Sequence, residues 1–249
     1  MSVTLLPGSA DQPEDDAAST SAATKALPAT ALPPSSGPPM IELRGLRLRG
    51  IELPADLDLL VRPGELITLT GPPKPGRSAL LNVLGLIDRP AAGSYVLDGT
   101  DTAKLREEDR AALRARKIGM VFAHKNLLPN RSLLDNVTLP LVYAGIPRRQ
   151  RMIAGLDVLS RVRLTGLAQR PARQVGNCQR AMCAVGRALI TQPDLLLCDE
   201  PTAGLETDEA EQVIGLLADL NREGRTVLVA TADQLAAAYS SKSVQIGQP

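Results

Sequence analysis

The feature that most constrains the fold is an alternation of short apolar runs with longer stretches of helical periodicity, which begins near residue 40. Strands are predicted at 41–48, 57–61, 65–71, 95–97, 118–122, 195–198 and 227–230. Helices are predicted at 78–87, 133–143, 150–162, 179–190 and 209–222. The central strands are almost wholly apolar, as in parallel sheets that helices cover on both faces. We therefore expect an α/β fold with a mostly parallel sheet.

Two segments depart from this alternation. Residues 123–186 carry no strand pattern, so we expect a helical subdomain inserted into the sheet. Residues 1–39 are rich in Pro, Ala and Ser and contain no aromatic residue. Such a composition buries too little apolar surface to offset the entropy of ordering. We predict a disordered tail at 1–39, with a docking role as the alternative, and one ordered domain at 40–249.

Charge and composition argue against several classes of function. The 28 Lys and Arg residues nearly balance the 27 Asp and Glu residues, which leaves a formal net charge of +1. With only 2% aromatic residues as well, the composition argues against a nucleic-acid-binding protein. The first residues lack the pattern of a secretory signal, and no apolar run approaches the length of a membrane span. We expect a protein that is neither secreted by that route nor membrane-spanning.

Three cysteines lie in one stretch, at Cys178, Cys183 and Cys198. Their odd number and their spacing match neither a disulfide framework nor a zinc site. We expect them to be small buried hydrophobic side chains, which suits a reducing compartment.

A predicted strand, a turn rich in Gly and Pro and a predicted helix meet at residues 71–78, which read G-P-P-K-P-G-R-S. This matches the phosphate-loop pattern G-x-x-x-x-G-K-[S/T], except that arginine replaces the lysine. In such loops the backbone amides at the helix start surround phosphate, and the lysine reaches the terminal phosphates. Alone the motif is weak, because strand, turn and helix often follow one another. The candidate nucleotide-binding residues are Gly71, Lys74, Gly76, Arg77, Ser78 and Ala79.

A second motif makes the first informative. Residues 195–202 read L-L-L-C-D-E-P-T, an apolar strand that ends in two acids. Asp199 stands where phosphate-loop enzymes hold Mg²⁺, and Ser78 is the other candidate metal ligand. Glu200 is the type of residue that orients or deprotonates an attacking water. Together the motifs predict a nucleotide and Mg²⁺ site with Glu200 as the catalytic residue, and plain surface acids are the alternative.

The sequence from about Ile41 to Gln245 resembles the ATP-binding-cassette (ABC) transporter ATPases, especially those that serve lipoprotein-release, macrolide-export and cell-division permeases. The resemblance rests on segments 61–99, 118–141, 186–206 and 226–233. It implies a RecA-like P-loop NTPase fold with an N-terminal antiparallel β part. It also implies a dimer, of two like or two different cassettes, that sandwiches ATP and drives an integral-membrane permease. The protein would then be cytoplasmic and peripheral at the inner face of the cell membrane.

The sequence departs from this family at catalytic positions. Ala123 stands in place of the family's glutamine, which senses Mg²⁺ and the attacking water, and Ala232 in place of its switch histidine. Neither methyl group can form a hydrogen bond with phosphate or water. The signature L-S-G-G-Q reads V-G-N-C-Q at 175–179, and the D-loop aspartate is Glu206.

Other departures affect nucleotide binding. Pro73 and Pro75 each remove a backbone N–H from the phosphate loop. The planar fork of Arg77 is larger than an ammonium and does not replace it at a tight site. No Tyr or Phe lies between residues 41 and 71, where the family stacks adenine. We therefore expect weak affinity for ATP.

These departures leave two functions in competition. We expect a cassette that docks on a permease with little or no hydrolysis, because losing one charge-stabilising group can cost about 100- to 1,000-fold in rate. A working ATPase that uses Asp199 and Glu200 is the alternative. The permease surface is expected at 126–129 and 132–141, with helical core as the alternative for the later leucines. The single histidine, His124, is interpreted as an exposed loop residue, with compensation for the lost glutamine as the alternative.

Overall fold

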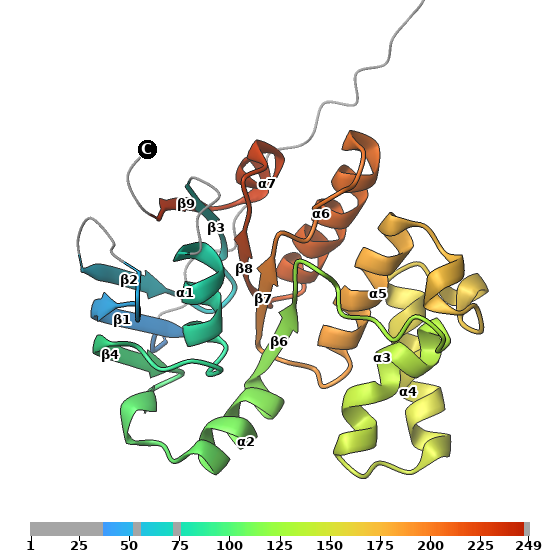
Figure 1. Ribbon diagram of the computed structural model, residues 1–249, viewed down its shortest axis with the longest axis horizontal. Coiled ribbons are helices and arrows are strands. Elements are labelled where there is room, and N and C mark those ends of the chain that lie inside the picture. Colours follow the sequence, from blue (N-terminus) through green and yellow to red (C-terminus); the bar gives the residue numbers. More distant parts are fainter. Residues whose placement is uncertain (1–36, 52–55, 72–75, 247–249) are drawn as a thin grey trace, which may run out of the picture.

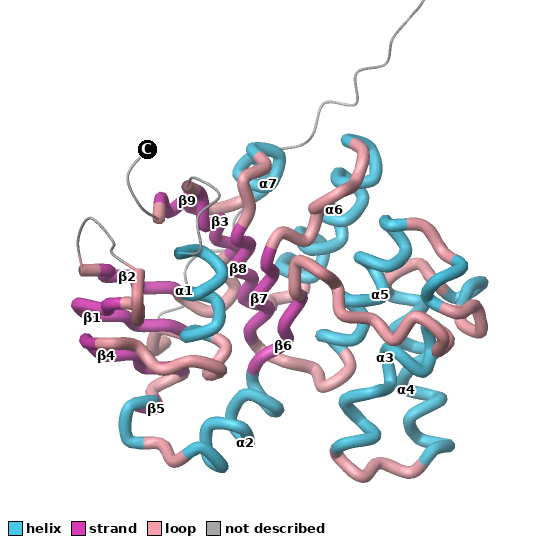
Figure 2. The backbone as a smooth tube through the Cα atoms, viewed as in Figure 1, coloured by secondary structure: helices cyan, strands magenta, loops and turns pink. Residues whose placement is uncertain are grey.

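A computed structural model describes residues 37–51, 56–71 and 76–246 of the chain. Its larger sheet has five strands, and every pairing in it is parallel. The strand order is β6 (Ile118–Val121), β7 (Leu195–Asp199), β8 (Thr226–Ala230), β3 (Leu66–Thr70) and β9 (Lys242–Gln245). Figure 2 shows these strands running through the middle of the molecule with helices on either side. The predicted parallel sheet is therefore confirmed.

A second, antiparallel sheet lies beside it, in the order β2 (Leu57–Val61), β1 (Ile41–Arg47), β4 (Ala92–Leu97) and β5 (Thr100–Asp101). The register of β1 shifts between Arg44 and Arg47 on the β4 side. At this irregularity, a Cβ on Gly93 would lie 2.2 Å from the carbonyl oxygen of Gly45, and Gly93 also has a φ of +83°. Only glycine fits there. The family resemblance implied this antiparallel part, and the structure contains it.

Seven α-helices complete the described part of the chain. They are α1 (Gly76–Leu84), α2 (Glu107–Lys117), α3 (Leu133–Tyr143), α4 (Arg148–Arg161), α5 (Asn177–Leu189), α6 (Thr207–Arg222) and α7 (Gln234–Tyr239). Figure 1 shows α3, α4 and α5 together at one side of the parallel sheet, and α1 between the two sheets. The described residues between β6 and β7 form these three helices and two short 3₁₀ turns, with no strand. The boundaries predicted for a helical subdomain stay a prediction.

Alternating side chains of the central strands enter two separate cores. In β7, Leu196 and Cys198 pack with α3 to α6, whereas Leu195 and Leu197 pack with α1 and the antiparallel sheet. The two-residue period of a strand sends successive side chains to opposite faces. Because both faces of the sheet are covered, its central strands β7, β8 and β3 are mostly apolar, which is why they could be located from sequence.

Three hydrogen bonds hold the segment at the C-terminal end of α1. The buried Tyr95 hydroxyl donates to the carbonyl oxygen of Leu84 at 2.9 Å. From α2, Arg110 donates to the carbonyl of Asp88 and Arg114 to that of Leu86, each at 2.8 Å. The end of α1 is therefore attached to both the antiparallel sheet and α2.

Several elements have no counterpart among the predictions. Helix α2 is mostly charged and buries only Arg110 and Leu113, so it lacks an apolar period. Helix α7 has six residues and β9 has four, with one half-buried and three exposed side chains in β9. Residues 1–36 of the predicted tail lie outside the described residues.

Two other predictions concern the cysteines and membrane-spanning segments. Cys178, Cys183 and Cys198 are free and buried, as expected. Among the described residues, no helix combines the length and the hydrophobicity needed to cross a bilayer.

Candidate functional site

The candidate site lies at the carboxyl edge of the parallel sheet, where β3, β7 and β8 end. Gly71 follows β3 with a φ of +140°, and a Cβ there would lie 2.3 Å from the carbonyl oxygen of Ile246. Helix α1 begins at Gly76, which is buried. Residues 72–75, among them Pro73, Lys74 and Pro75, lie outside the described residues. The binding role predicted for Lys74 therefore stays a prediction.

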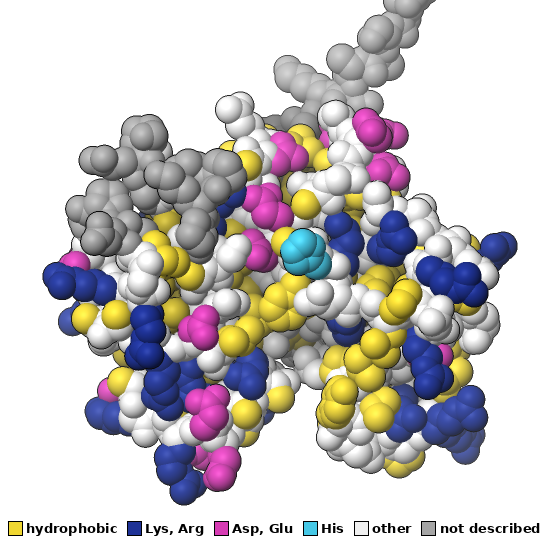
Figure 3. Space-filling model, in the orientation of Figure 1, with side chains coloured by type: hydrophobic (Ala, Val, Ile, Leu, Met, Phe, Trp, Pro, Cys, Tyr) yellow, Lys and Arg dark blue, Asp and Glu magenta, His cyan; other side chains and the backbone are white. Residues whose placement is uncertain are grey.

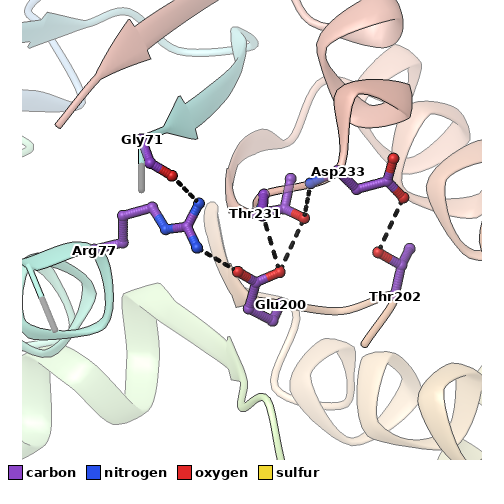
Figure 4. Close-up of polar contacts among 7 residues, drawn as sticks. Gly71, Arg77, Glu200, Thr202, Thr231 and Asp233 are labelled. Atoms are coloured by element: carbon purple, nitrogen blue, oxygen red, sulfur yellow. Dashed lines mark hydrogen bonds and ion pairs between the residues drawn. The ribbon is translucent and has the colours of Figure 1, made fainter. Parts of the chain in front are cut away.

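Arg77 and Glu200 form the centre of the site (Figure 4). A side-chain nitrogen of Arg77 lies 2.6 Å from Glu200 Oε1, and another donates to the carbonyl oxygen of Gly71 at 2.9 Å. The Arg77 side chain is only 6% exposed and that of Glu200 is 27% exposed. Arg77, which the sequence predicts at the position of the phosphate lysine, thus has both ends of its guanidinium fork bound to protein oxygens. Charge-assisted bonds of this length and burial are among the stronger polar contacts in proteins.

The backbone fixes the direction of Glu200. Its φ is +43°, an uncommon conformation for a non-glycine residue that costs of order 1 to 3 kcal/mol. Its N–H donates to the carbonyl oxygen of Ala230 at 2.8 Å, across the β7–β8 pair. The second carboxylate oxygen, Oε2, accepts a hydrogen bond from the Thr231 hydroxyl at 3.0 Å and a longer one from the Ala232 N–H at 3.4 Å. Both carboxylate oxygens therefore have protein donors.

Polar contacts extend from Glu200 through Thr231 and Asp233 to Thr202, and the sequence did not predict them. The buried Thr231 hydroxyl also accepts from the backbone N–H of Asp233 at 3.0 Å, and the Thr202 hydroxyl lies 3.5 Å from Asp233 Oδ2. Figure 4 shows these side chains converging from the ends of β7 and β8. The signal was present, since Thr231 directly follows an apolar strand that adjoins the one carrying the acids.

The two candidate metal ligands occupy the same edge of the sheet. Asp199 is the last residue of β7 and is half-buried, and Ser78 is exposed in the first turn of α1. A carboxylate and a hydroxyl are hard oxygen donors of the kind that Mg²⁺ takes, together with water and substrate phosphates. Within the described ranges there is no group of three or more His, Cys, Asp or Glu residues able to hold a metal by themselves. These residues therefore fit Mg²⁺ held jointly with phosphate. Ala79 is half-buried and packs against the core beneath the antiparallel sheet.

The two alanines that the sequence analysis predicts at catalytic positions present no polar side chain to this site. Ala123 is half-buried just after β6, and Ala232 is exposed just after β8. His124 is exposed in a turn. That turn is therefore the exposed loop that the sequence indicated.

The altered signature segment opens α5. Asn177 donates to the carbonyl oxygen of Gly204 at 3.3 Å, and its own side-chain oxygen accepts a hydrogen bond from Arg180. Cys178 is buried beneath α6, with Sγ 3.9 Å from the carbonyl oxygen of Glu209. The two side chains that replace the signature glycines therefore bind and pack within the chain. Glu206 directly precedes α6 as its N-cap residue.

Comparison with known proteins places this architecture in one family. The ABC transporter family model matches residues 55–203. Over 191 residues, which are 77% of this chain, the sequence is 36% identical to the macrolide export ATP-binding/permease protein MacB of Rhodopseudomonas palustris (strain BisB18). The chain spans 29% of the length of that relative. It is also 35% identical to the ABC transporter ATP-binding protein YvrO of Bacillus subtilis, over 76% of this chain and 83% of that protein.

Solved structures agree with the sequence matches. The dimeric structure of MJ0796, a bacterial ABC transporter cassette, superimposes with a TM-score of 0.75 at 30% identity, covering 84% of this chain and 94% of that one. A dimeric post-hydrolysis state of MJ0796 bound to ADP and Pi has the same TM-score at 29% identity. The fold and its site define an ATP-binding cassette with a P-loop NTPase architecture. The chain belongs to the ABC transporter family.

Proposed function

We propose that this chain is an ATP-binding-cassette subunit that docks on a membrane permease, binds Mg-ATP weakly and hydrolyses little or no ATP. The observation that carries the proposal is the ion pair between Arg77 and Glu200 at 2.6 Å. The arginine predicted to bind the terminal phosphate is engaged by the carboxylate predicted to act in catalysis. Binding a terminal phosphate and activating a water would both require that this pair separate or share its partners.

Weak nucleotide binding follows from the same contact. Arg77 donates to Gly71 and Glu200, so phosphate must displace charge-assisted bonds before it gains its own. Within the described residues, β1, β2 and β3 themselves contain no aromatic residue that could stack on adenine; Phe122 directly follows β6, and Tyr239 packs half-buried on α7 against the core. Tyr95 is buried with its hydroxyl bonded to Leu84, and Tyr143 lies at the far end of α3. Titration of the full chain with Mg-ATP tests this point, and a micromolar or tighter affinity would contradict it.

Slow hydrolysis follows from the residues that surround Glu200. At the two alanine positions, Ala123 and Ala232, a methyl group cannot hydrogen-bond to water or phosphate. Removing one preorganised group of this type can cost about 100- to 1,000-fold in rate, although such losses are not additive. The alternative is a functional ATPase that drives transport through Asp199 and Glu200, and it is favoured by the retention of both acids and of Ser78 at the same sheet edge.

ATP turnover separates these two functions. The full chain should hydrolyse Mg-ATP at a rate close to that of its Glu200→Gln variant. Restoring the family residues together, as Arg77→Lys, Ala123→Gln and Ala232→His, should raise turnover in a way that Glu200→Gln then abolishes. If instead the unmodified chain turns over ATP steadily and Glu200→Gln stops it, the functional ATPase is the correct assignment.

An apolar pocket supports docking on a permease. It has a volume of about 680 Å³ and lies between α2, β6, α3 and the C-terminal half of α5. Met120, Phe122, Leu139 and Pro140 contribute to its wall. Arg187 closes one side by donating to the carbonyls of Lys125 and Asn126, and burial lowers its pKa. A pocket of this size and composition suits an apolar helical segment of a partner.

We infer a smaller permease contact than the one expected at 126–129 and 132–141, because several residues of those segments are buried. Leu133, Leu134 and Val137 are buried core residues, and Leu127 also packs against that core. Leu128, by contrast, is 42% exposed. The proposed permease contact therefore centres on Leu139 and its neighbours. Leu139→Glu should move the protein out of the membrane fraction of cells, whereas Leu128→Glu should have the smaller effect.

The remaining partners are proposed by analogy with the relatives. A second cassette, identical or different, is the expected dimer partner, because the two MJ0796 structures are dimeric. The subunit would lie at the inner face of the cell membrane, with no nucleic-acid partner, as the formal charge of +1 suggests. Size measurement by light scattering, with and without Mg-ATP, tests the dimer.

A further inference from the structure

The α3–α4 hairpin carries an exposed apolar surface outside the pocket just described. Tyr143 is 85% exposed, Ile153 64%, Val142 46% and Leu156 42%. Few large apolar side chains of the described chain are this exposed, and these four belong to two consecutive helices. Side chains of this type left in water at one place mark an interaction surface.

Basic residues lie next to these apolar ones. The first turn of α4 contains Arg148, Arg149 and Arg151 and no acidic residue. None of the ion pairs found within the described residues involves these three arginines. Figure 3 shows apolar and basic side chains adjacent to each other over α3 and α4, at the lower right. We call these seven residues the hairpin patch: Val142, Tyr143, Arg148, Arg149, Arg151, Ile153 and Leu156.

The patch is held on a rigid support. Helices α3 and α4 approach so closely at Gly155 that a Cβ there would lie 2.4 Å from Thr138 Cγ2 and 2.5 Å from Leu134 Cδ1. Arg151 also donates to the carbonyl oxygen of Ile146, which fixes the connection between the helices. The patch is therefore a preformed surface. Tyr143 also lines the apolar pocket, so pocket and patch share one face of the molecule.

We propose that the hairpin patch binds the anionic surface of a lipid bilayer, with the arginines on lipid phosphates and the apolar side chains at the headgroup boundary. Arginine beside exposed tyrosine and aliphatic residues is the composition of interfacial segments. Arginine forms strong, bidentate contacts with phosphate. An acidic protein segment would match the charges but gives no reason for four exposed apolar side chains. The proposal goes beyond the proposed function, because it needs no permease and no nucleotide.

Binding of the full chain to lipid vesicles tests the proposal. Phosphatidylcholine vesicles that contain about one third phosphatidylglycerol should sediment the protein, and pure phosphatidylcholine vesicles should not. Binding should weaken as salt rises, because ions screen surface charge. The double variant Arg148→Gln/Arg149→Gln should bind anionic vesicles roughly 25-fold more weakly, at about fivefold for each arginine near the surface.

Matched variants complete the test. Arg44→Gln/Arg222→Gln removes two charges from exposed residues on β1 and α6, and should leave vesicle binding unchanged. Ile153→Ser should weaken binding, even at high salt, by removing an apolar contact. The variants at Arg148, Arg149 and Ile153 should keep the unfolding midpoint of the parent chain, because these three side chains are exposed.

Several results would overturn the proposal. They are equal binding to neutral vesicles, equal binding by the Arg148/Arg149 variant, or complete displacement by millimolar inorganic phosphate, which would indicate a free-anion site. Binding of an acidic peptide without any binding to vesicles would assign the patch to a protein partner. A failure here leaves the proposed cassette function untouched, because permease docking is tested separately, by Leu139→Glu in cells.

Discussion

Arg77 and Glu200 lie 123 residues apart in the sequence, yet their side chains meet at 2.6 Å. Arg77 comes from the start of α1 and Glu200 from the residue after β7, and β8 lies between β3 and β7 in the sheet. Two residues that the sequence predicts to act on a nucleotide are here bound to each other. Each residue therefore limits how readily the other can bind a phosphate or a water.

Replacing Glu200 by glutamine should strengthen ATP binding. The variant loses the carboxylate that holds Arg77, so the guanidinium becomes free to bind phosphate. A hydrogen bond to a charged group contributes about 1.5 to 3 kcal/mol, so Mg-ATP affinity should rise roughly 10- to 100-fold. Calorimetric titration measures the change. Glu211→Gln, the same charge change at an exposed position of α6, is the control. Unchanged or weaker binding by Glu200→Gln would show that the pair does not compete with phosphate.

Replacing Arg77 by methionine should destabilise the fold. The change leaves the Gly71 carbonyl and the Glu200 carboxylate without their donor. Breaking a buried pair from one side can cost about 3 to 5 kcal/mol. Glu200 keeps some contact with water, so we expect a loss of about 1 to 3 kcal/mol in the free energy of unfolding by urea. Arg77→Lys keeps a charge and should lose less. Equal stability of all three proteins would mean that water already screens the contact.

Two glycine-to-alanine changes should have opposite signs. A Cβ on Gly119 of β6 would lie 2.5 Å from the carbonyl oxygen of Ala188 and 2.8 Å from Leu196 Cδ2, so Gly119→Ala should cost about 1 to 3 kcal/mol. A Cβ on Gly215 of α6 meets no heavy atom within 4 Å. Gly215→Ala should therefore stabilise the helix by about 0.5 to 1 kcal/mol. Thermal and urea unfolding measure both variants. A neutral or stabilising Gly119→Ala would contradict the close packing around Gly119, and a destabilising Gly215→Ala would contradict the open space beside Gly215.

Stability should fall in alkaline solution because of two buried thiols. Burial raises the pKa of Cys183 and Cys198 from 9.0 to about 12. Between these values the unfolded chain releases the proton while the folded chain keeps it, so stability decreases as pH rises. The slope is about 1.4 kcal/mol per pH unit for each thiol. Below pH 9 the two states bind equal numbers of protons at these groups, and their contribution is constant.

Urea unfolding from about pH 8 to about pH 10.5 measures this slope. Cys183→Ala/Cys198→Ala should flatten it. Burial also raises the pKa of Tyr95, which adds a separate alkaline loss common to all variants. Val185→Ala removes buried volume from α5 without removing a thiol, and should lower stability by the same amount at every pH. An unchanged slope in the double cysteine variant would contradict the prediction.

The sequence predicts the parallel sheet because both of its faces are buried, so the central strands are mostly apolar. It fails at α2 because that helix presents Arg110 and Leu113 to the core and charges elsewhere. The ends of β3 and β7 could be recognised from their motifs, and so could Gly71, Ser78, Asp199 and Glu200 as candidates.

The contact that decides the proposed function could not be predicted. The replacement of lysine by Arg77 indicates a change of size and hydrogen-bonding shape, but its partner depends on strand order and on the left-handed backbone of Glu200. Leu127 illustrates the same limit on the surface. It is as apolar as Leu128, yet one packs into the core and the other is exposed. Local composition does not determine which side of a turn faces inward.

The attachment of α1 at its far end has a mechanical consequence. Tyr95, Arg110 and Arg114 fasten the carbonyls of Leu84, Asp88 and Leu86, all at the end away from Arg77. Since α1 is also packed along its length, with Leu80, Leu81 and Leu84 buried in the core, it can move only together with the elements attached to it. Any displacement that a bound phosphate produces at Arg77 would therefore be passed to the antiparallel sheet and to α2 together.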